Sequence, residues 1–296
     1  MNFIIMILEQ GLIYAIMAFG VYITYKILDF PDLTVDGCFP LGAAVTAALI
    51  TGGVNPYLTL PLSFLSGMVA GAMTGLIHVK AKVRDLLSGI IMMTALWSIN
   101  LFIAGTSNVP LFAKDNIFKN EAMDKIFKGG LSRFRTLIIV AVIVVVVKVL
   151  LDVYLKTKSG YLLRAVGDND TLVKSLAKDA GNVKILGLAL ANGLVALSGC
   201  LFAQEERVFE ISAGTGAIVI GIASVIIGTS LRKKLKFLGA TFAVLLGSVF
   251  YKGCVAIATI WAPPWAVKGA TAVIFLIILI VADGGKARVN KHAGAL

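Results

Sequence analysis

Long apolar runs alternate with short polar connections along most of this chain. Nine runs can be counted, at 3–25, 38–50, 57–77, 86–104, 134–155, 185–203, 213–228, 237–258 and 265–282. A helix needs about 20 apolar residues to cross the hydrocarbon core of a bilayer. The runs at 38–50 and 213–228 are shorter than that, so we expect the first to borrow from the polar residues before it or to be a broken or re-entrant helix. The pattern predicts an all-α polytopic membrane protein with about nine transmembrane segments.

Composition agrees with this interpretation. The 296 residues are 58% hydrophobic and only 15% charged, and the mean hydropathy is +0.93, whereas soluble domains carry about 25% charged residues. We therefore expect one transmembrane domain over 1–296 and no soluble domain. The net charge of +11 favours contact between cytoplasmic loops and anionic lipid. Nucleic acid is not expected as a partner, because the basic residues are not interleaved with aromatic ones.

The basic residues also predict an orientation. If the C-terminal tail is cytoplasmic, counting back over nine crossings gives the cytoplasmic connections 17 of the 27 Lys and Arg residues, against eight outside and two within helices. This places the N-terminus outside, with an extracytoplasmic loop at 105–133, a cytoplasmic coupling segment at 157–183 and a cytoplasmic tail at 283–296. We expect the cell membrane of a bacterial-type cell.

Two polar interruptions stand just before apolar helices, at 32–44 and 209–217. Each combines acidic and hydroxyl residues with glycine, and they occupy corresponding places in two pseudo-repeated halves. Paired interruptions of this kind often mark the translocation path of a transporter. Two ordinary interfacial loops, with Asp36 or Ser212 as a helix N-cap, explain the pattern equally well.

Motifs for catalysis and phosphate binding are missing from the sequence. There is no GxxxxGK[ST] loop, and the two histidines, His78 and His292, have no metal-ligand spacing to other residues. Cys38, Cys200 and Cys254 are expected to pack as small hydrophobic residues. We therefore expect a transport subunit that is not an enzyme and binds no metal or cofactor, with ATP and Mg²⁺ held by a separate ATPase chain.

Charge is almost missing from the centres of the apolar runs. Lys148 and Lys252 are placed near helix ends, and only Asp32 and Asp36 are acids that reach membrane depth. This weakens the case for an ion-coupled secondary transporter or channel, which remains the alternative function. The glycines Gly67, Gly71 and Gly75, spaced by four residues, predict a close helix–helix contact.

The segment 157–182 is a polar stretch between two apolar runs. Asp168 and Asn169 are N-cap candidates for a short amphipathic helix that continues to about residue 179, and Gly181 is placed just after its end. Such a helix parallel to the membrane can press on a soluble partner, or it can lie on lipid headgroups. The pattern alone does not separate these two roles.

Three stretches resemble the ABC-transporter permeases of the branched-chain amino acid, ribose and simple-sugar type. They are GLIYAIMAFG at 11–20, the block at 159–204 with its Arg164–Ala165 pair, and the segment from AGTG at 213–216 to IGTSL at 227–231. The chain is most similar to the group labelled tryptophan/tyrosine transport permeases. It departs from the sugar members at 32–37, where DLTVDG has Thr in place of Ser and an additional acid, and at Ile227–Gly228, where the family has two glycines.

The resemblance implies an ABC importer that moves an amino acid or a related small polar solute. Its partners would be two cytoplasmic ATP-binding subunits, a second permease copy in a homodimer, and an external solute-binding protein. The residues assigned to coupling with the ATPase are Arg164, Asp168, Asn169, Leu172, Leu176, Lys178 and Gly181. The residues assigned to the translocation path are Asp32, Thr34, Asp36, Trp97, Asn100, Gly214, Thr215 and Gly216.

Overall fold

Helices make up nearly all of the structure. The structure, a computed structural model, describes residues 2–120, 123, 127, 129–169, 173, 179–235, 237–261, 263 and 266–293. The N-terminal helices are α1 (Asn2–Val21), which continues as the π-helix η1 (Tyr22–Ile27), α2 (Val35–Thr51), the 3₁₀ turn η2 (Pro56–Leu58), α3 (Thr59–Val79) and α4 (Asp85–Ala104). Within these described ranges, seven helical segments are long and apolar enough to cross a membrane, and two shorter apolar helices accompany them. The predicted fold class is confirmed.

The second part of the chain contains the polar segment and the remaining long helices. Its elements are β1 (Asn108–Pro110), the 3₁₀ turn η3 (Gly129–Phe134), α6 (Arg135–Leu155), α7 (Lys158–Asp168), α9 (Ala180–Glu206), β2 (Val208–Glu210), the 3₁₀ turn η4 (Ile211–Gly214), α10 (Ala217–Lys234), α11 (Ala240–Trp261) and α12 (Val267–Ala293). The strands β1 and β2 pair antiparallel, with Val109 opposite Phe209. This small sheet joins the α4–η3 connection to the end of α9.

The helix α9 forms the centre of the bundle, packed against α1, α2 and α3. Three glycines on α3 make the closest contact possible: Gly67 and Gly71 lie against the carbonyls of Asn192 and Leu188, and Gly75 lies against the backbone of Ile185. A side chain at any of these glycines would collide with the α9 backbone. The close contact predicted from the four-residue spacing is therefore confirmed, and its partner is α9.

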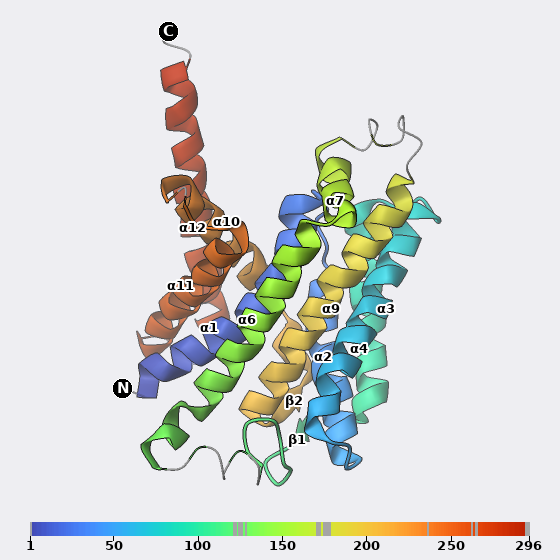
Figure 1. Ribbon diagram of the computed structural model, residues 1–296, viewed down its shortest axis with the longest axis vertical. Helices are drawn as coiled ribbons and strands as arrows, with labels where there is room; N and C mark the ends of the chain where they lie inside the picture. The colour runs from blue at the N-terminus through green and yellow to red at the C-terminus, as the bar shows by residue number, and fades with distance from the viewer. Residues whose placement is uncertain are drawn as a thin grey trace.

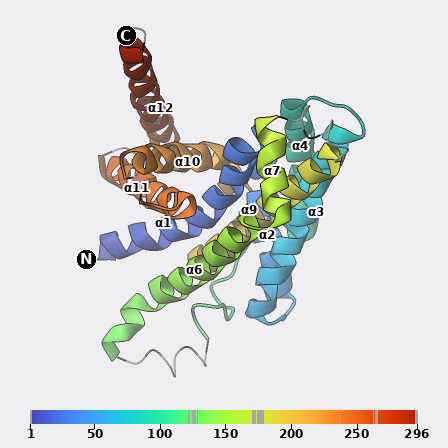
Figure 2. The ribbon, with the colours of Figure 1, turned by 45° about the horizontal axis from the view of Figure 1, so that its top comes forward.

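The last three long helices pack on the other side of α1. Helices α10 and α11 contact each other and both contact α1, while α12 packs against α10 and α11. In Figure 2, α10 and α11 lie side by side next to α1. Close packing within this pair uses glycine again, because Gly228 lies against Ala243 and Val244 and Gly247 lies against Ser224.

The two ends of the bundle differ in what they carry. Figure 1 shows the N-terminus and the β1–β2 pair at one end, and α7 and the C-terminal end of α12 at the other. The described chain therefore begins near the end that carries the β1–β2 pair and finishes on the side that carries α7.

Three local expectations are corrected by the structure. Residues 158–168 form a helix of their own, α7, whereas the sequence placed a helix only after Asp168. Gly181 lies in the first turn of α9 and does not end a preceding helix, because Asp179 caps α9 by accepting hydrogen bonds from the Gly181 and Asn182 amides. Lys252 lies near the middle of α11, twelve residues from its start and nine from its end.

Candidate functional site

The first break in the bundle lies between η1 and α2 and is held by Asp32. Its carboxylate accepts a hydrogen bond from the Thr34 backbone amide at 2.9 Å and another from the Asn192 side-chain amide of α9 at 2.7 Å. Asp32 is 2% exposed, and in the described part of the chain it has no basic side chain as an ion-pair partner. The break is therefore fixed to the central helix through a buried carboxylate and an amide.

Thr34 extends this polar group to α3. Its hydroxyl hydrogen-bonds to the Thr74 hydroxyl at 3.0 Å, and both side chains are fully buried. The side chain of Asn192 fits beside Gly71, which lacks the Cβ that would occupy this space. Buried polar groups need such partners, because an unpaired one costs free energy in an apolar interior.

The second break, at 207–216, meets the first at Asp36. One carboxylate oxygen of Asp36 accepts from the Gly216 amide at 3.0 Å, and the other accepts from the Ile218 amide at 2.8 Å. Asp36 stands in the first turn of α2, yet these amides begin α10, 180 residues further along the chain. A carboxylate at a helix N-terminus satisfies free amides and stabilises the positive end of the helix dipole, so a side chain of α2 caps the N-terminus of α10.

Glycine makes this junction possible. Gly216, the residue before α10, has φ of 84°, a left-handed conformation that favours glycine. Gly214 lies directly against the Asp36 carbonyl oxygen and the ring of Pro40. Asp36 is thus a helix cap, as one of the two sequence interpretations has it, but for α10 and not for its own helix. Ser212 does not cap α10, and its hydroxyl donates to the Glu210 carboxylate.

The other residues assigned to the path divide into two groups. Asn100 is buried and donates from its side-chain amide to the Gly37 carbonyl at 3.0 Å, so it joins the junction at the start of α2. Thr215 is exposed beside Gly216. Trp97 is 46% exposed on α4.

The helix α7 presents one apolar face and one polar face. Leu163 and Val166 are buried, and Gly167 lies against the carbonyl of Ile27 at the end of η1. The opposite face is exposed, and its residues follow helical spacing: Tyr161, Arg164, Ala165 and Asp168, with Asn169 beyond the helix end. Of the other residues assigned to coupling, Leu172, Leu176 and Lys178 lie outside the described residues.

Comparison with known proteins identifies the family. The family described as the branched-chain amino acid transport system / permease component matches residues 3–282. The chain belongs to this family. The permease is therefore a multi-pass subunit of an ABC-type transport system in the cell membrane, a kind of system in which permease subunits work with ATP-binding subunits.

Similar permeases come from bacteria and archaea. A tyrosine transport system permease protein of Clostridioides difficile (strain R20291) is 44% identical over 252 residues, which cover 85% of this chain and 81% of that protein. A probable branched-chain amino acid transport permease protein LivH of Methanocaldococcus jannaschii is 27% identical and covers 73% of this chain and 70% of its own. The ribose import permease RbsC of Escherichia coli (strain K12) is 25% identical over 75% of this chain and 67% of its own.

A solved structure shares the fold. The structure of PsaBC from Streptococcus pneumoniae in complex with Fab matches with a TM-score of 0.50 and 12% sequence identity, over 92% of this chain and 89% of the matched chain. The expected resemblance to branched-chain amino acid and ribose permeases is confirmed by the family match and by these relatives.

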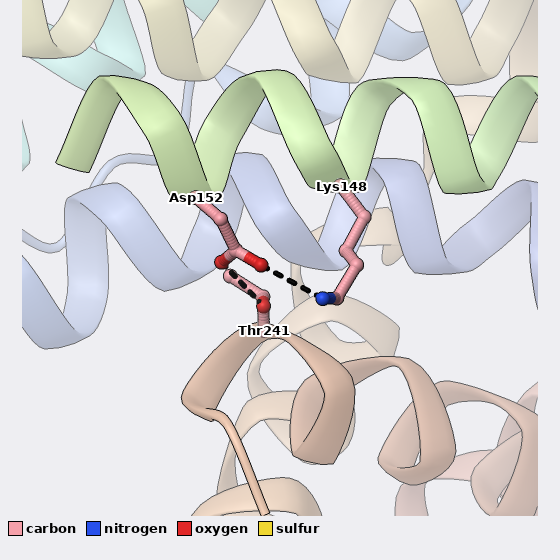
Figure 3. A network of polar contacts seen from close by, with 3 residues as sticks. All are labelled: Lys148, Asp152 and Thr241. Atoms are coloured by element: carbon pink, nitrogen blue, oxygen red, sulfur yellow. Dashed lines mark hydrogen bonds and ion pairs between the residues drawn. The ribbon is translucent and has the colours of Figure 1, made fainter. Parts of the chain in front are cut away.

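A polar link that the sequence did not indicate joins two parts of the permease. Asp152, near the end of α6, pairs with Lys148 at 2.8 Å and accepts a hydrogen bond from the Thr241 hydroxyl of α11 at 2.7 Å (Figure 3). Lys148 and Asp152 stand one helical turn apart, which is an ordinary surface spacing. Nothing in the local sequence points to Thr241, 89 residues away.

Proposed function

We propose that this permease is the membrane subunit of an ATP-driven importer for an amino acid, with aromatic amino acids as the first candidates. The observation that carries the proposal is the similarity, at 44% identity over most of both chains, to a protein named as a tyrosine transport system permease. The relative named for branched-chain amino acids supports the wider class of amino acids. An external binding protein would deliver the solute, and ATP with Mg²⁺ would bind to the partner ATPase and not to this chain.

The exposed face of α7 is proposed as part of the surface that contacts the ATPase. It lies at the end of the bundle that also holds the C-terminal end of α12 (Figure 1), which the basic residues assign to the cytoplasm. Its buried face rests on η1 through Gly167 and Ile27. A push on α7 would thus reach the end of η1, directly before the Asp32 break.

The junction of the two breaks is proposed as the part of the solute path formed by one subunit. Irregular backbone at membrane depth is tolerated where protein or a water-filled cavity covers it. Helix N-termini that meet inside a transporter offer free amides to anionic groups, and here Asp36 occupies the N-terminus of α10. A second copy of the chain would complete the path, with the exposed Thr215 toward it.

Reconstitution tests the proposal directly. The permease, its ATP-binding subunit and its solute-binding protein are placed in proteoliposomes, and uptake of labelled L-tyrosine is measured with ATP and with a non-hydrolysable analogue. We expect uptake with ATP only. Uptake that needs no nucleotide and collapses with an ion gradient would instead establish the ion-coupled alternative, with Asp32 as its acid.

A further inference from the structure

Charged side chains gather where α1 and α11 meet the end of α9: Glu206, the last residue of α9, is exposed, and Glu205 and Lys252 are partly buried. Lys252, near the middle of α11, places its ammonium 3.7 Å from the ring centre of Tyr14 and 3.5 Å from the side-chain oxygen of Gln10. The Gln10 side-chain nitrogen donates to Glu206 at 2.9 Å. Ionisable residues within membrane helices are costly and generally functional, so this group needs an explanation that the junction at Asp36 does not supply.

The charges in this group are close together but not directly paired. Within the described part of the chain, Lys252 has no ion pair with a carboxylate. One oxygen of Glu205 is buried and lacks a hydrogen-bond partner. The Gln10 amide stands between the two signs of charge, with its oxygen toward the ammonium and its nitrogen toward a carboxylate.

The geometry around the group is fixed by close helix contacts. The Ser248 hydroxyl of α11 donates to the Gly11 carbonyl at 2.9 Å, and the Ser198 hydroxyl of α9 donates to the Ile13 carbonyl at 2.7 Å. Gly11 itself lies against the backbone of Val249. The charged side chains therefore extend from a rigid three-helix contact.

Aromatic rings border the charges on the side toward the junction. Tyr14 stacks on Phe39 with ring centres 5.4 Å apart, and Phe202 meets Tyr14 edge-on at 5.8 Å. Phe39 lies one helical turn after Asp36 on α2. The buried rings of Tyr14 and Phe39 thus lie between the charged group and the junction at Asp36.

We propose that Lys252 with Glu205 and Glu206 forms a site for the zwitterionic head group of an amino acid. The α-carboxylate binds the Lys252 ammonium, and the α-ammonium binds the glutamates. The Gln10 amide presents the same order of acceptor and donor without charge, so a zwitterion displaces its contacts and gains charge-assisted hydrogen bonds. The inference rests on the proposed amino-acid import and names the groups that recognise the solute.

Other solutes would use the site differently. A simple cation needs only the glutamates and is repelled by Lys252. A neutral sugar gains nothing from a full positive charge next to a full negative one. A site for an amino acid is therefore distinguished by its need for both charges of the solute and for both charges of the protein.

Saturation-transfer NMR on the full-length permease in nanodiscs tests the site without the binding protein. The probes are L-tyrosine, L-leucine, tyramine, which lacks the carboxylate, and 3-(4-hydroxyphenyl)propionate, which lacks the ammonium. We expect transfer to both amino acids, and at least tenfold weaker apparent affinity for the two analogues. The variants Lys252→Met and Glu206→Gln should each lose the preference for the zwitterion, while Lys268→Met, an exposed lysine on α12, keeps it.

The outcomes separate the site from the proposed function. If the variants hold the zwitterion as tightly as the unaltered permease, or if tyramine binds as well as L-tyrosine, the site is refuted. That result leaves ATP-driven uptake in proteoliposomes intact. Absence of that uptake refutes the importer, whatever the NMR shows. Thermal stability of each variant, measured in the same nanodiscs, identifies any variant that has simply unfolded.

Discussion

The contact of Asp36 with the start of α10 gives the sharpest test of the structure. Replacement by alanine removes the acceptor of two backbone amides, at Gly216 and Ile218. An unpaired donor costs about 1–3 kcal/mol, and the lower part of that range applies because Asp36 is only partly buried. The expected loss is therefore about 2–3 kcal/mol for the two amides together.

Asparagine at position 36 separates hydrogen bonding from charge. Its side-chain oxygen can still accept from one of the two amides, whereas its NH₂ group faces the other donor. We expect Asp36→Asn to lose about half of the stabilisation that alanine loses, and to lose the interaction with the helix dipole, about 0.3–1 kcal/mol. Stability should therefore fall in the order Asp, Asn, Ala.

The assay is thermal unfolding of the purified permease together with ATP-driven uptake. A loss of 2–3 kcal/mol corresponds to about 4–12 °C for a chain of this size, and uptake should fall at least tenfold. Asp85→Ala is the matched control, because the one side-chain hydrogen bond of Asp85 among the described residues is accepted from the amide of its neighbour Leu86. Equal unfolding temperatures for Asp36→Ala and the control would refute the cross-helix cap.

Three further substitutions test other contacts. Gly71→Leu should block the approach of α3 to α9 and abolish the folded permease in a detergent gel-filtration assay, while Gly269→Leu, where no atom lies near, should elute normally. Arg164→Glu on the exposed face of α7 should leave insertion intact but uncouple ATP hydrolysis from uptake, and normal uptake would contradict the docking role. Asp152→Asn should lower the unfolding temperature by a few degrees, because it weakens the contacts with Lys148 and Thr241. A double-mutant cycle with Thr241→Val should show a coupling free energy of about 0.5–3 kcal/mol. Additive effects of the two substitutions would contradict the link.

The long helices could be predicted from sequence because membrane length and hydrophobicity act locally. Each span needs its own run of apolar residues, so the runs place the helices without knowledge of the fold. The glycine spacing of α3 also acts locally, since Gly67, Gly71 and Gly75 necessarily share one face of a helix. The partner of that face, α9, could not be predicted in this way.

The helix α7 escaped prediction for a physical reason. It contains Gly160 and Gly167, and glycine lowers helix propensity by about 1 kcal/mol. The structure shows that tertiary contacts require both, because Gly160 lies against the Tyr154 carbonyl and Gly167 against the Ile27 carbonyl. Packing overrides propensity here, and the sequence does not record that packing locally.

The junction was predicted in part. The two interruptions were recognised from glycine, acid and hydroxyl residues, and the structure brings Asp36, Gly214 and Gly216 into contact. The sequence left open whether Asp36 lines a path or caps a helix. Deciding it required knowing that α2 and α10, far apart in the chain, begin at the same place. Lys252 was misplaced for a related reason. The apolar run at 237–258 begins before α11 begins and stops before α11 ends, so Lys252 was placed too near the end of its helix.

The polar contacts show how α10 and α11 are held to the rest of the bundle. In a bilayer, apolar contacts between helices can be exchanged for contacts with lipid at little cost, so packing alone holds helices weakly in a single register. Asp36 ties the start of α10 to α2, and Asp152 ties the start of α11 to α6. The helix α6 leads directly into α7. The helix α7 rests on Ile27 at the end of η1, and α2 begins after the break that follows η1. Both hydrogen-bonded ties therefore connect α10 and α11 to the elements next to α7. A displacement of α7 that reaches α2 moves α10 with it, and one that reaches α6 moves α11, unless the hydrogen bond in question breaks.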